Sequence, residues 1–419
     1  MEVIVLPLGI VAVGLVVLRL GVYTVSSLQR AASQRERDAL SLQLLNERIN
    51  VARRQRETSG LAWNGYRKFE IVRKIAEAEG IVSFYLEPHD GKALARFKAG
   101  QYLTFRLKVP GRDKPVVRCY SLSDCHDSKC YRVTIKRVMP PRDAPLAPPG
   151  LVSNFFHEQL DEGAIVDVQA PRGHFYLDPQ RERPAVLIAG GVGITPILSM
   201  VKTVAECGSG RELLIFYGVR DRASHAFREE LEKLVENHAN LRLIVSYSQP
   251  APEDMSGEGS EFHNTGRVTI ELVKSYLPST NYEFYLCGTP GMMETLNQQL
   301  IEWGVAENAI LTEAFGPATV SKAFHQPKPD QDTAVACQVT FAKSGVECAW
   351  EPSSENLLDF ANAKGVNIDS GCRAGNCGTC VVAVKSGQVT YVTEHGADLE
   401  DGSCLTCIAA PDGDVVLDA

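Results

Sequence analysis

The sequence has no surplus of basic residues. Lysine and arginine number 43 against 51 aspartates and glutamates, a formal net charge of −8, which argues against a nucleic-acid-binding protein. It has no internal repeats, so nothing indicates a repeat array. Its 12 cysteines in 419 residues are too few for a disulfide-stapled scaffold. The length instead allows two or three domains with sizeable cores.

Five of the cysteines gather near the C-terminal end, whereas the other seven lie singly. The clustered ones are Cys372, Cys377, Cys380, Cys404 and Cys407. Fixed spacing of this kind in a long chain indicates metal ligation in a reducing compartment.

One long apolar run, at residues 3–18, continues past Arg19 to Tyr23. Roughly 20 apolar residues span a bilayer, so the run suffices if Arg19 snorkels. A cleaved signal peptide needs a basic start and an A-x-A site, and this run has neither. We therefore expect residues 1–25 to be a single-pass transmembrane anchor in contact with membrane lipid. Arginines follow the run and no Lys or Arg precedes it, which predicts cytoplasmic catalytic domains.

The sequence pattern of the rest of the chain changes at three points. Residues 26–62 are charged and predict a helical spacer without a sustained heptad. From Tyr66 on, alternating segments such as 101–109 and 131–138 predict antiparallel strands. From Pro184 on, strand and helix patterns alternate, which predicts a parallel sheet with crossover helices. After a polar, proline-bearing linker, the pattern changes again for the C-terminal domain.

The spacing C-x4-C-x2-C over residues 372–380 is that of a plant-type ferredoxin, which needs one more cysteine downstream. Zinc usually takes two C-x2-C pairs or added histidines, and neither is present here. An odd offset on a strand would put Cys404 and Cys407 on opposite faces, so only one of them should face the metal. Residues 335–419 resemble a plant-type [2Fe–2S] ferredoxin of the β-grasp kind. The resemblance selects Cys407, which matches the pattern L-x-C before an apolar stretch.

Two motifs in the middle of the chain suit a flavin. The segment RCYSLS (118–123) lies between two segments of alternating pattern. Its Arg offers a cation for a phosphate, its Tyr offers a flat face for a flavin ring, and its Ser offers a hydroxyl for a ring nitrogen or carbonyl. In GLVSNFF (150–156), Ser153 is expected to cap a helix whose first amides would hold a pyrophosphate.

Three further motifs follow. In LIAGGVGITPILSM (187–200), a hydrophobic strand runs into a glycine-rich turn and then a helix, which suits a dinucleotide phosphate although it is not G-x-G-x-x-G. YLCGTPGMM (285–293) is again a strand that ends in a glycine turn, and EAFGP (313–317) comes last.

These five motifs, in this order, resemble the ferredoxin–NADP reductase superfamily from Tyr66 to Pro317, and most of all the reductase half of flavohaemoglobins. The resemblance implies a role for each matching residue. The implied flavin-binding residues are Tyr102, Arg118, Cys119, Tyr120, Ser121, Val152, Ser153, Asn154, Phe315, Gly316 and Pro317. The implied dinucleotide-binding residues are Gly190, Gly191, Val192, Gly193, Ile194, Thr195 and Pro196. The candidate catalytic residues are Ser121, Cys287 and Glu313, and the implied metal ligands are Cys372, Cys377, Cys380 and Cys407.

The resemblance also implies the architecture: a multidomain protein with an antiparallel β-barrel, an α/β parallel-sheet domain and a β-grasp domain behind a transmembrane helix. The expected segments are the anchor at 1–25, the spacer at 26–62, the FAD-binding barrel at 63–180, the NAD(P)-binding domain at 181–320, the linker at 321–334 and the [2Fe–2S] domain at 335–419.

The implied activity is an NAD(P)H-dependent reductase that passes electrons through FAD and a [2Fe–2S] cluster to an acceptor such as an oxygenase. The motifs favour FAD over FMN. Asp221, between Arg220 and Arg222 in the segment after the second strand of the nucleotide domain, slightly favours NADH over NADPH. Two alternatives stay open: a dehydrogenase that acts directly on quinone or oxygen, and a redox-sensing membrane protein.

Overall fold

The computed structural model describes most of the chain beyond residue 62. The described part runs from 63 to 419 without residues 127–128, 141–143, 256–261, 314, 316–336, 352–353, 392–396 and 398. By internal contacts the chain divides into Met1–Leu61 and Ala62–Ala419. The predicted anchor, spacer and linker lie outside the described residues. Within the described ranges, no helix combines the length and hydropathy needed to cross a bilayer.

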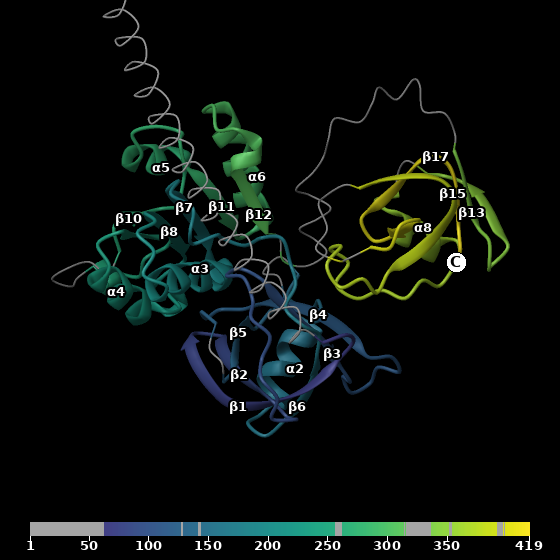
Figure 1. Cartoon of the computed structure of the whole chain (residues 1–419), viewed down its shortest axis with the longest axis horizontal. Helices are drawn as coiled ribbons and strands as arrows, with labels where there is room; N and C mark the ends of the chain where they lie inside the picture. The colour runs from purple at the N-terminus through teal and green to yellow at the C-terminus, as the bar shows by residue number, and fades with distance from the viewer. Residues whose placement is uncertain are drawn as a thin grey trace, which may run out of the picture. The chain divides into compact units, whose positions relative to one another are not determined.

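The first sheet has six strands that pair antiparallel in the order β4-β3-β6-β1-β2-β5 (Figure 1). Its strands are β1 (Arg67–Ala78), β2 (Ile81–Pro88), β3 (Tyr102–Leu107), β4 (Val116–Ser121), β5 (Tyr131–Lys136) and β6 (Ile165–Val168). A bridge between Leu122 and Val133 joins the two edges, so the sheet curls toward the expected barrel. Helix α2 (Leu151–Gln159) places Phe156 edge-on against Phe84 and Phe105 in its core.

The second sheet is parallel throughout, in the order β10-β9-β8-β7-β11-β12. Its strands are β7 (Ala185–Gly190), β8 (Leu213–Val219), β9 (Leu241–Tyr247), β10 (Asn264–Thr265), β11 (Glu283–Cys287) and β12 (Ile310–Glu313). Strand β7 is buried on both faces, as its unbroken apolar sequence requires. The chain order reverses beside β7, and in such sheets ligands bind outside the carboxyl ends of the strands at that point.

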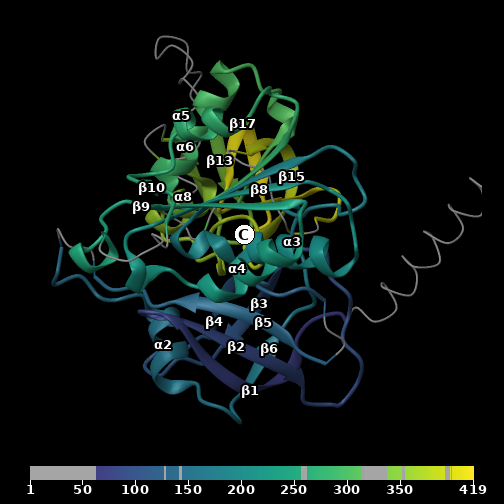
Figure 2. The ribbon, with the colours of Figure 1, turned by 90° about the vertical axis from the view of Figure 1, so that its left-hand side faces the viewer.

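Helices cover both faces of the parallel sheet. Helices α3 and α4 pack on one face, and α5 and α6 on the other (Figure 2). Their bounds are α3 (Ile194–Glu206), α4 (Arg228–Asn237), α5 (Ile270–Tyr276) and α6 (Pro290–Glu302). Short 3-10 turns are η1 (Gly191–Gly193), η2 (Arg222–Ser224), η3 (Pro252–Met255) and η4 (Glu307–Ala309).

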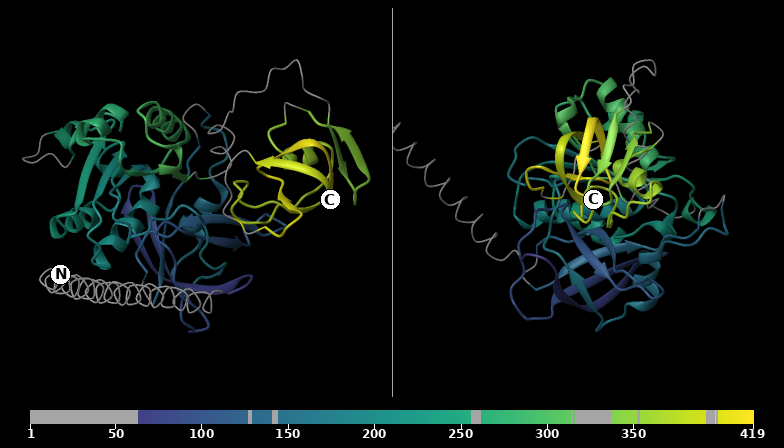
Figure 3. Two further views of the ribbon diagram at one scale, coloured as in Figure 1. Left: turned by 45° about the horizontal axis from the view of Figure 1, so that its top comes forward. Right: turned by 90° about the vertical axis from the view of Figure 1, so that its right-hand side faces the viewer.

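The third sheet is mixed, in the order β14-β13-β17-β15-β16, with β13 and β17 parallel and the other pairs antiparallel. Its strands are β13 (Gln338–Phe341), β14 (Val346–Ala349), β15 (Val381–Tyr391), β16 (Ser403–Leu405) and β17 (Ala409–Leu417), the last drawn in yellow in Figure 3. Helix α8 (Leu357–Ala363) buries Leu357, Leu358 and Phe360 against it. The expected succession of antiparallel, parallel and C-terminal domains is thus confirmed.

One strand was not predicted. The segment RCYSLS lies along the chain between the two expected strands, now β3 and β5, but its first four residues belong to a further strand, β4, which pairs with β3. The pairing sets Tyr102 opposite Ser121 and Phe105 opposite Arg118. Polar side chains at these positions hide the strand in the sequence, because the two-residue period of apolar residues breaks there.

Candidate flavin, nucleotide and iron–sulfur sites

A small cavity, partly open to solvent, lies where β3 and β4 meet the end of β12 and the cysteine loop. The lining residues are Tyr102, Arg118, Cys119, Ser121, Glu313, Phe315, Cys372, Ala374 and Asn376. Six of these were assigned to the flavin or to catalysis from the sequence, and Cys372 to the metal. The structure therefore brings the two predicted sites to one cavity.

Glu313 closes β12 beside this cavity and is 8% exposed. Ser121 Oγ donates a hydrogen bond of 3.0 Å to Glu313 Oε2. Burial raises the pKa of Glu313 to about 8, although the bond from Ser121 acts in the opposite direction. The carboxyl group therefore keeps its proton at neutral pH.

Cys287 ends β11, in register with Glu313 on β12 and Ala189 on β7. It is fully buried, and burial, followed by the neighbouring Glu313 carboxyl, raises its pKa well above the ordinary value. The thiol is therefore neutral. It sits at the carboxyl end of the sheet, where the chain order reverses, as a nicotinamide-facing residue would.

The glycine-rich turn after β7 packs directly on the end of β11. A Cβ atom on Gly193 would lie 2.1 Å from the carbonyl oxygen of Cys287, so only glycine fits there. Gly191 adopts a positive φ of 55°. Thr195 turns its hydroxyl inward and donates to the Val192 carbonyl oxygen at 3.0 Å. The turn is thus shaped by its own contacts and leads into α3, whose N-terminus lies at the predicted dinucleotide site.

The other predicted dinucleotide residues follow the same turn. Gly190 ends β7, and a Cβ atom there would meet the sulfur of Met292 on α6 at 2.6 Å. Ile194 and Pro196 are buried in the first turn of α3. The turn therefore offers its backbone, and not these side chains, to a ligand.

The prediction that Ser153 caps α2 is wrong. The helix begins at Leu151, its N-cap is Gly150, and no side chain caps it. Because Ser153 lies inside the first turn, its hydroxyl donates to the Gly150 carbonyl and accepts from the Val138 amide, each at 3.2 Å. Asn154 likewise donates to the carbonyls of Val138 and Gly150. These bonds tie the helix start to the segment that follows β5.

Three other predicted flavin residues have structural partners. Arg118 donates through Nη1 to the carbonyls of Val117, at 2.7 Å, and of Gly371 in the cysteine loop, at 3.0 Å. Tyr120 packs edge-on against aromatic rings of the barrel core, and Val152 is buried in that core. Phe315 is 36% exposed at the cavity, whereas Gly316 and Pro317 lie outside the described residues.

The four predicted metal ligands are all buried cysteines, arranged in two pairs. The Cys372 amide donates to Cys377 Sγ at 3.2 Å. Cys380 Sγ and Cys407 Sγ lie 3.1 Å apart. Within the described ranges, no three His, Cys, Asp or Glu side chains are arranged to hold a single metal ion. Two pairs of thiols instead suit a centre of two irons with four thiolates.

Backbone amides converge on the sulfur of Cys372. The N–H groups of Ala374, Asn376 and Cys377 donate to it over 3.3–3.4 Å. Such bonds stabilise anionic sulfur, so the loop fits an iron–sulfur cluster. Cys119, assigned from the sequence to the flavin alone, lines the same cavity as Cys372 and packs against the core of the cysteine domain.

The expectation that only one of Cys404 and Cys407 faces the metal rested on a strand that is shorter than expected. Strand β16 ends at Leu405, so Cys407 lies in the following turn and the argument from opposite strand faces does not apply. Cys404 lies on β16 and pairs with Val382 on β15. Cys407 therefore reaches Cys380 because of the turn after β16, and not because of the alternation of side chains along a strand.

No pattern in the amino-acid sequence indicated the contacts between the cysteine loop and the barrel. Tyr102 Oη donates to the Asn376 carbonyl at 3.1 Å, and Lys114 pairs with Asp369 at 2.7 Å. Val117 on β4 is 6% exposed and joins the core of the third sheet. These pairs are more than 250 residues apart along the chain, so no local pattern encodes them.

Three families match the chain in succession. The family described as "Oxidoreductase FAD-binding domain" matches residues 68–176, "Oxidoreductase NAD-binding domain" matches 187–298, and "2Fe-2S iron-sulfur cluster binding domain" matches 327–412. The chain is a ferredoxin–NADP reductase-like reductase with a [2Fe–2S] domain. This reductase is an NAD(P)H-dependent oxidoreductase, and its cofactors are FAD and a [2Fe–2S] cluster, as the motifs predicted.

Curated relatives of this reductase include flavohemoproteins. It is 37% identical to that of Halalkalibacterium halodurans over 273 residues, 64% of this chain and 65% of the relative. It is 38% identical to that of Deinococcus radiodurans over 256 residues, 61% and 60% of the two chains. The chain thus spans less than two thirds of the length of these relatives.

Two solved structures are similar to the reductase. The FAD/NAD-binding domain of a nitric oxide dioxygenase from Vibrio cholerae is 31% identical with a TM-score of 0.53, and the match covers 61% of this chain and all of that one. Phthalate dioxygenase reductase is 25% identical with a TM-score of 0.52, and the match covers 85% of this chain and 98% of that one.

Proposed function

We propose that this reductase delivers electrons from NAD(P)H, by way of its FAD and its [2Fe–2S] cluster, to a separate oxygenase. The observation that carries the proposal is the shared cavity, where Tyr102, Ser121 and Glu313 of the flavin site and Cys372 of the cysteine loop line one space. When bound, FAD takes up electrons in pairs and releases them singly, which lets it serve a one-electron centre.

The chain's own residues hold the two sites together. Tyr102 and Arg118 each donate a hydrogen bond to a carbonyl of the cysteine loop, at Asn376 and Gly371. The apolar side chain of Val117 packs into the core of the cysteine domain, between the barrel and the cysteine loop. A short path between the two sites follows from these contacts.

The nature of the acceptor is supported by a relative. Phthalate dioxygenase reductase is described as a modular structure for electron transfer from pyridine nucleotides to [2Fe–2S], and its name couples it to a dioxygenase. The match covers 85% of this chain and 98% of that one, so it extends over nearly the whole of the relative. We take an oxygenase as the acceptor of this chain for that reason.

The route is tested with Cys377→Ser. We expect rapid NADH-dependent reduction of ferricyanide in both proteins, but loss of cytochrome c reduction in the variant, because the one-electron exit is gone. Cys207→Ser, at an exposed cysteine, is the matched control and should keep both activities. Cytochrome c or quinone reduction at the unmodified rate in cluster-free Cys377→Ser would contradict the proposal and favour direct reduction of quinone or oxygen.

The acceptor is tested by isolating the full chain from its own membranes with its bound partner. We expect an oxygenase whose turnover requires this reductase and fails with Cys377→Ser. A partner without oxygenase activity, supported equally well by the variant, would overturn the assignment. Negligible NAD(P)H oxidation by the flavin-loaded protein would instead favour a redox sensor.

We also propose that residues 1–25 anchor the chain in a membrane, with its catalytic domains in the cytoplasm. The support is the apolar run at 3–18 and the arginines that follow it. The full chain should stay in the pellet after alkaline carbonate extraction. Leu15→Asp, which costs about 3 kcal/mol at the centre of a span, should shift it to the supernatant. Release of the unmodified chain by carbonate would contradict the anchor.

The orientation has a separate test. Protease added to inside-out vesicles should digest the reductase domains, and protease added to right-side-out vesicles should not. The opposite pattern would place these domains on the other side of the membrane.

A further inference from the structure

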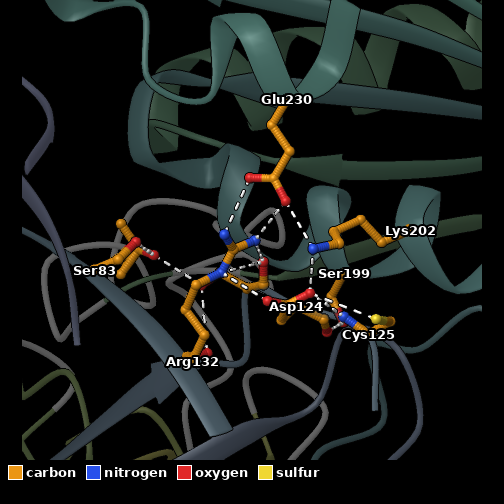
Figure 4. Close-up of polar contacts among 9 residues, drawn as sticks. Ser83, Asp124, Cys125, Arg132, Ser199, Lys202 and Glu230 are labelled. Carbon is orange, nitrogen blue, oxygen red and sulfur yellow. Dashed lines mark hydrogen bonds and ion pairs between the residues drawn. The ribbon is translucent and has the colours of Figure 1, made fainter. Parts of the chain in front are cut away.

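A network of four charged side chains, built around the buried Arg132, joins the barrel to the parallel-sheet domain (Figure 4). It consists of Arg132 on β5, Asp124 after β4, Lys202 on α3 and Glu230 on α4. Arg132 contacts Glu230 at 3.0 Å and Asp124 at 3.3 Å, and Lys202 contacts Glu230 at 2.7 Å and also Asp124. Two cations and two anions thus alternate and balance.

The two cations are better shielded from water than the two carboxylates. The side chain of Arg132 is 4% exposed and that of Lys202 is 16% exposed, against 21% for Asp124 and 28% for Glu230. Arg132 also donates to the carbonyl of Ser123, so its guanidinium is held by three acceptors. Removing one member of such a set leaves a buried charge unpaired, which is costly, whereas exposed pairs matter little.

The connected elements are those predicted to hold the two ligands. Asp124 lies three residues after Ser121, which lines the flavin cavity at the end of β4. Helix α3 begins directly after the glycine-rich turn at the dinucleotide site. Ser199 on this helix donates to the Asp124 carbonyl at 2.7 Å, and Lys202 one turn later binds the Asp124 carboxylate. Asp124 therefore ties the flavin strand to the nucleotide helix.

Hydride transfer needs its two reacting atoms about 3–3.5 Å apart, and a 1 Å error can cost a hundredfold in rate. Here one atom is carried by a ligand of the barrel and the other by a ligand of the parallel-sheet domain. We propose that Arg132, Asp124, Lys202 and Glu230 are positioning residues that set the nicotinamide against the flavin. The proposal concerns NAD(P)H oxidation alone, so it is independent of the acceptor.

The chain offers a matched control. Glu283 on β11 also receives two cations, Arg211 at 2.6 Å and Arg181, and it is 5% exposed. Its partners all lie within the parallel-sheet domain. Glu230→Gln and Glu283→Gln therefore remove the same charge from two similar networks, and only the first network crosses between domains.

The test measures the two variants beside the unmodified holoenzyme, with NADH or NADPH, whichever binds more tightly. For Glu230→Gln we expect flavin reduction in stopped flow to slow at least tenfold, with a nucleotide Kd changed less than threefold. The long-wavelength absorbance of the nucleotide–flavin complex should weaken. Amide hydrogen exchange in residues 121–126 and at the start of α3 should speed up, in the cofactor-free protein as well. Glu283→Gln should change none of these beyond twofold.

Unchanged flavin reduction, absorbance and exchange in Glu230→Gln, with only a lower melting temperature, would overturn the proposal. If Glu230→Gln does not fold, Lys202→Met and Lys202→Arg decide the question by the same readouts. Lys202→Arg should restore at least half of the rate lost in Lys202→Met, because it keeps the charge between Asp124 and Glu230. Equal rates of flavin reduction in the unmodified protein, Lys202→Met and Lys202→Arg would overturn the proposal.

Discussion

At the scale of single residues, surroundings decide the chemistry. Glu313 and Ser121 lie in different domains, yet a hydrogen bond joins them at the wall of the flavin cavity. Burial raises the pKa of Glu313 from 4.5 to about 8, so an ordinary acidic side chain becomes a proton holder at neutral pH. The sequence indicated the position of Glu313, but its protonation follows from burial alone.

Glu313 predicts how stability depends on pH. The folded protein binds this proton more tightly than the unfolded chain does, so its stabilising contribution is complete below pH 4.5 and is lost as pH rises to about 8. The isosteric Glu313→Gln has no such proton. The free energy of unfolding of the unmodified protein, relative to that of Glu313→Gln, should therefore fall between pH 5 and pH 8 by an amount on the order of a few kcal/mol. Chemical denaturation of both proteins at each pH measures it. A pH-independent difference would contradict the buried, protonated carboxyl.

The assignment of the fourth cluster ligand is tested by two cysteine variants. Cys407→Ser removes a sulfur 3.1 Å from Cys380 Sγ, so the visible absorbance of the cluster and its iron content should fall by more than half. Cys404 is equally buried but pairs with β15, so Cys404→Ser should keep the cluster. Iron and sulfide analysis with electron paramagnetic resonance after reduction measures both. Loss of the cluster in Cys404→Ser alone would reverse the assignment.

At the scale of elements, the turn between β7 and α3 is held by close backbone packing. The missing side chain of Gly193 admits the carbonyl of Cys287, which brings the ends of β7 and β11 together. Each element is readable from its own sequence, because apolar strands and glycine-rich turns are local signals. Their mutual approach is a property of the folded sheet.

Gly193→Ala should therefore impair nucleotide binding. The added methyl group would lie 2.1 Å from the Cys287 carbonyl, so the turn must move and the Kd for NADH should rise at least tenfold, about 1.4 kcal/mol. Gly291→Ala is the control, since it lies in the first turn of α6 in the same domain with nothing within 4 Å of the new methyl group. Equal nucleotide affinity in the two variants, by titration of flavin absorbance, would show that the close contact is unimportant.

At the scale of the whole molecule, the contact between the barrel and the cysteine loop couples the two redox sites. Val117 is the apolar centre of this contact, and a Cβ atom on Gly371 would lie 2.9 Å from it. The hydrogen bonds from Tyr102 and Arg118 flank it. The exposed pair of Lys114 and Asp369 contributes little beside them, because water screens it.

Val117→Asp should separate the cysteine loop from the barrel, because the contact would bury an unpaired charge. We expect cytochrome c reduction to fall at least tenfold while ferricyanide reduction stays within twofold, with FAD and iron content unchanged. Val381→Asp, at an exposed site on β15, is the control and should keep both rates. Parallel loss of both activities in Val117→Asp would mean that flavin binding itself had failed.

The order of the domains, the cysteine spacing and the glycine-rich turn could be predicted from the amino-acid sequence alone, because each is encoded within a few neighbouring residues. The same reasoning assigned Ser153 the wrong role and missed the strand within RCYSLS, where polar side chains obscure the local period. Three further features became visible only in the folded protein: Arg118 contacts the cysteine loop, Glu313 keeps a proton, and Asp124 binds Lys202. These contacts depend on burial and on residues far apart along the chain, and no short-range pattern records either.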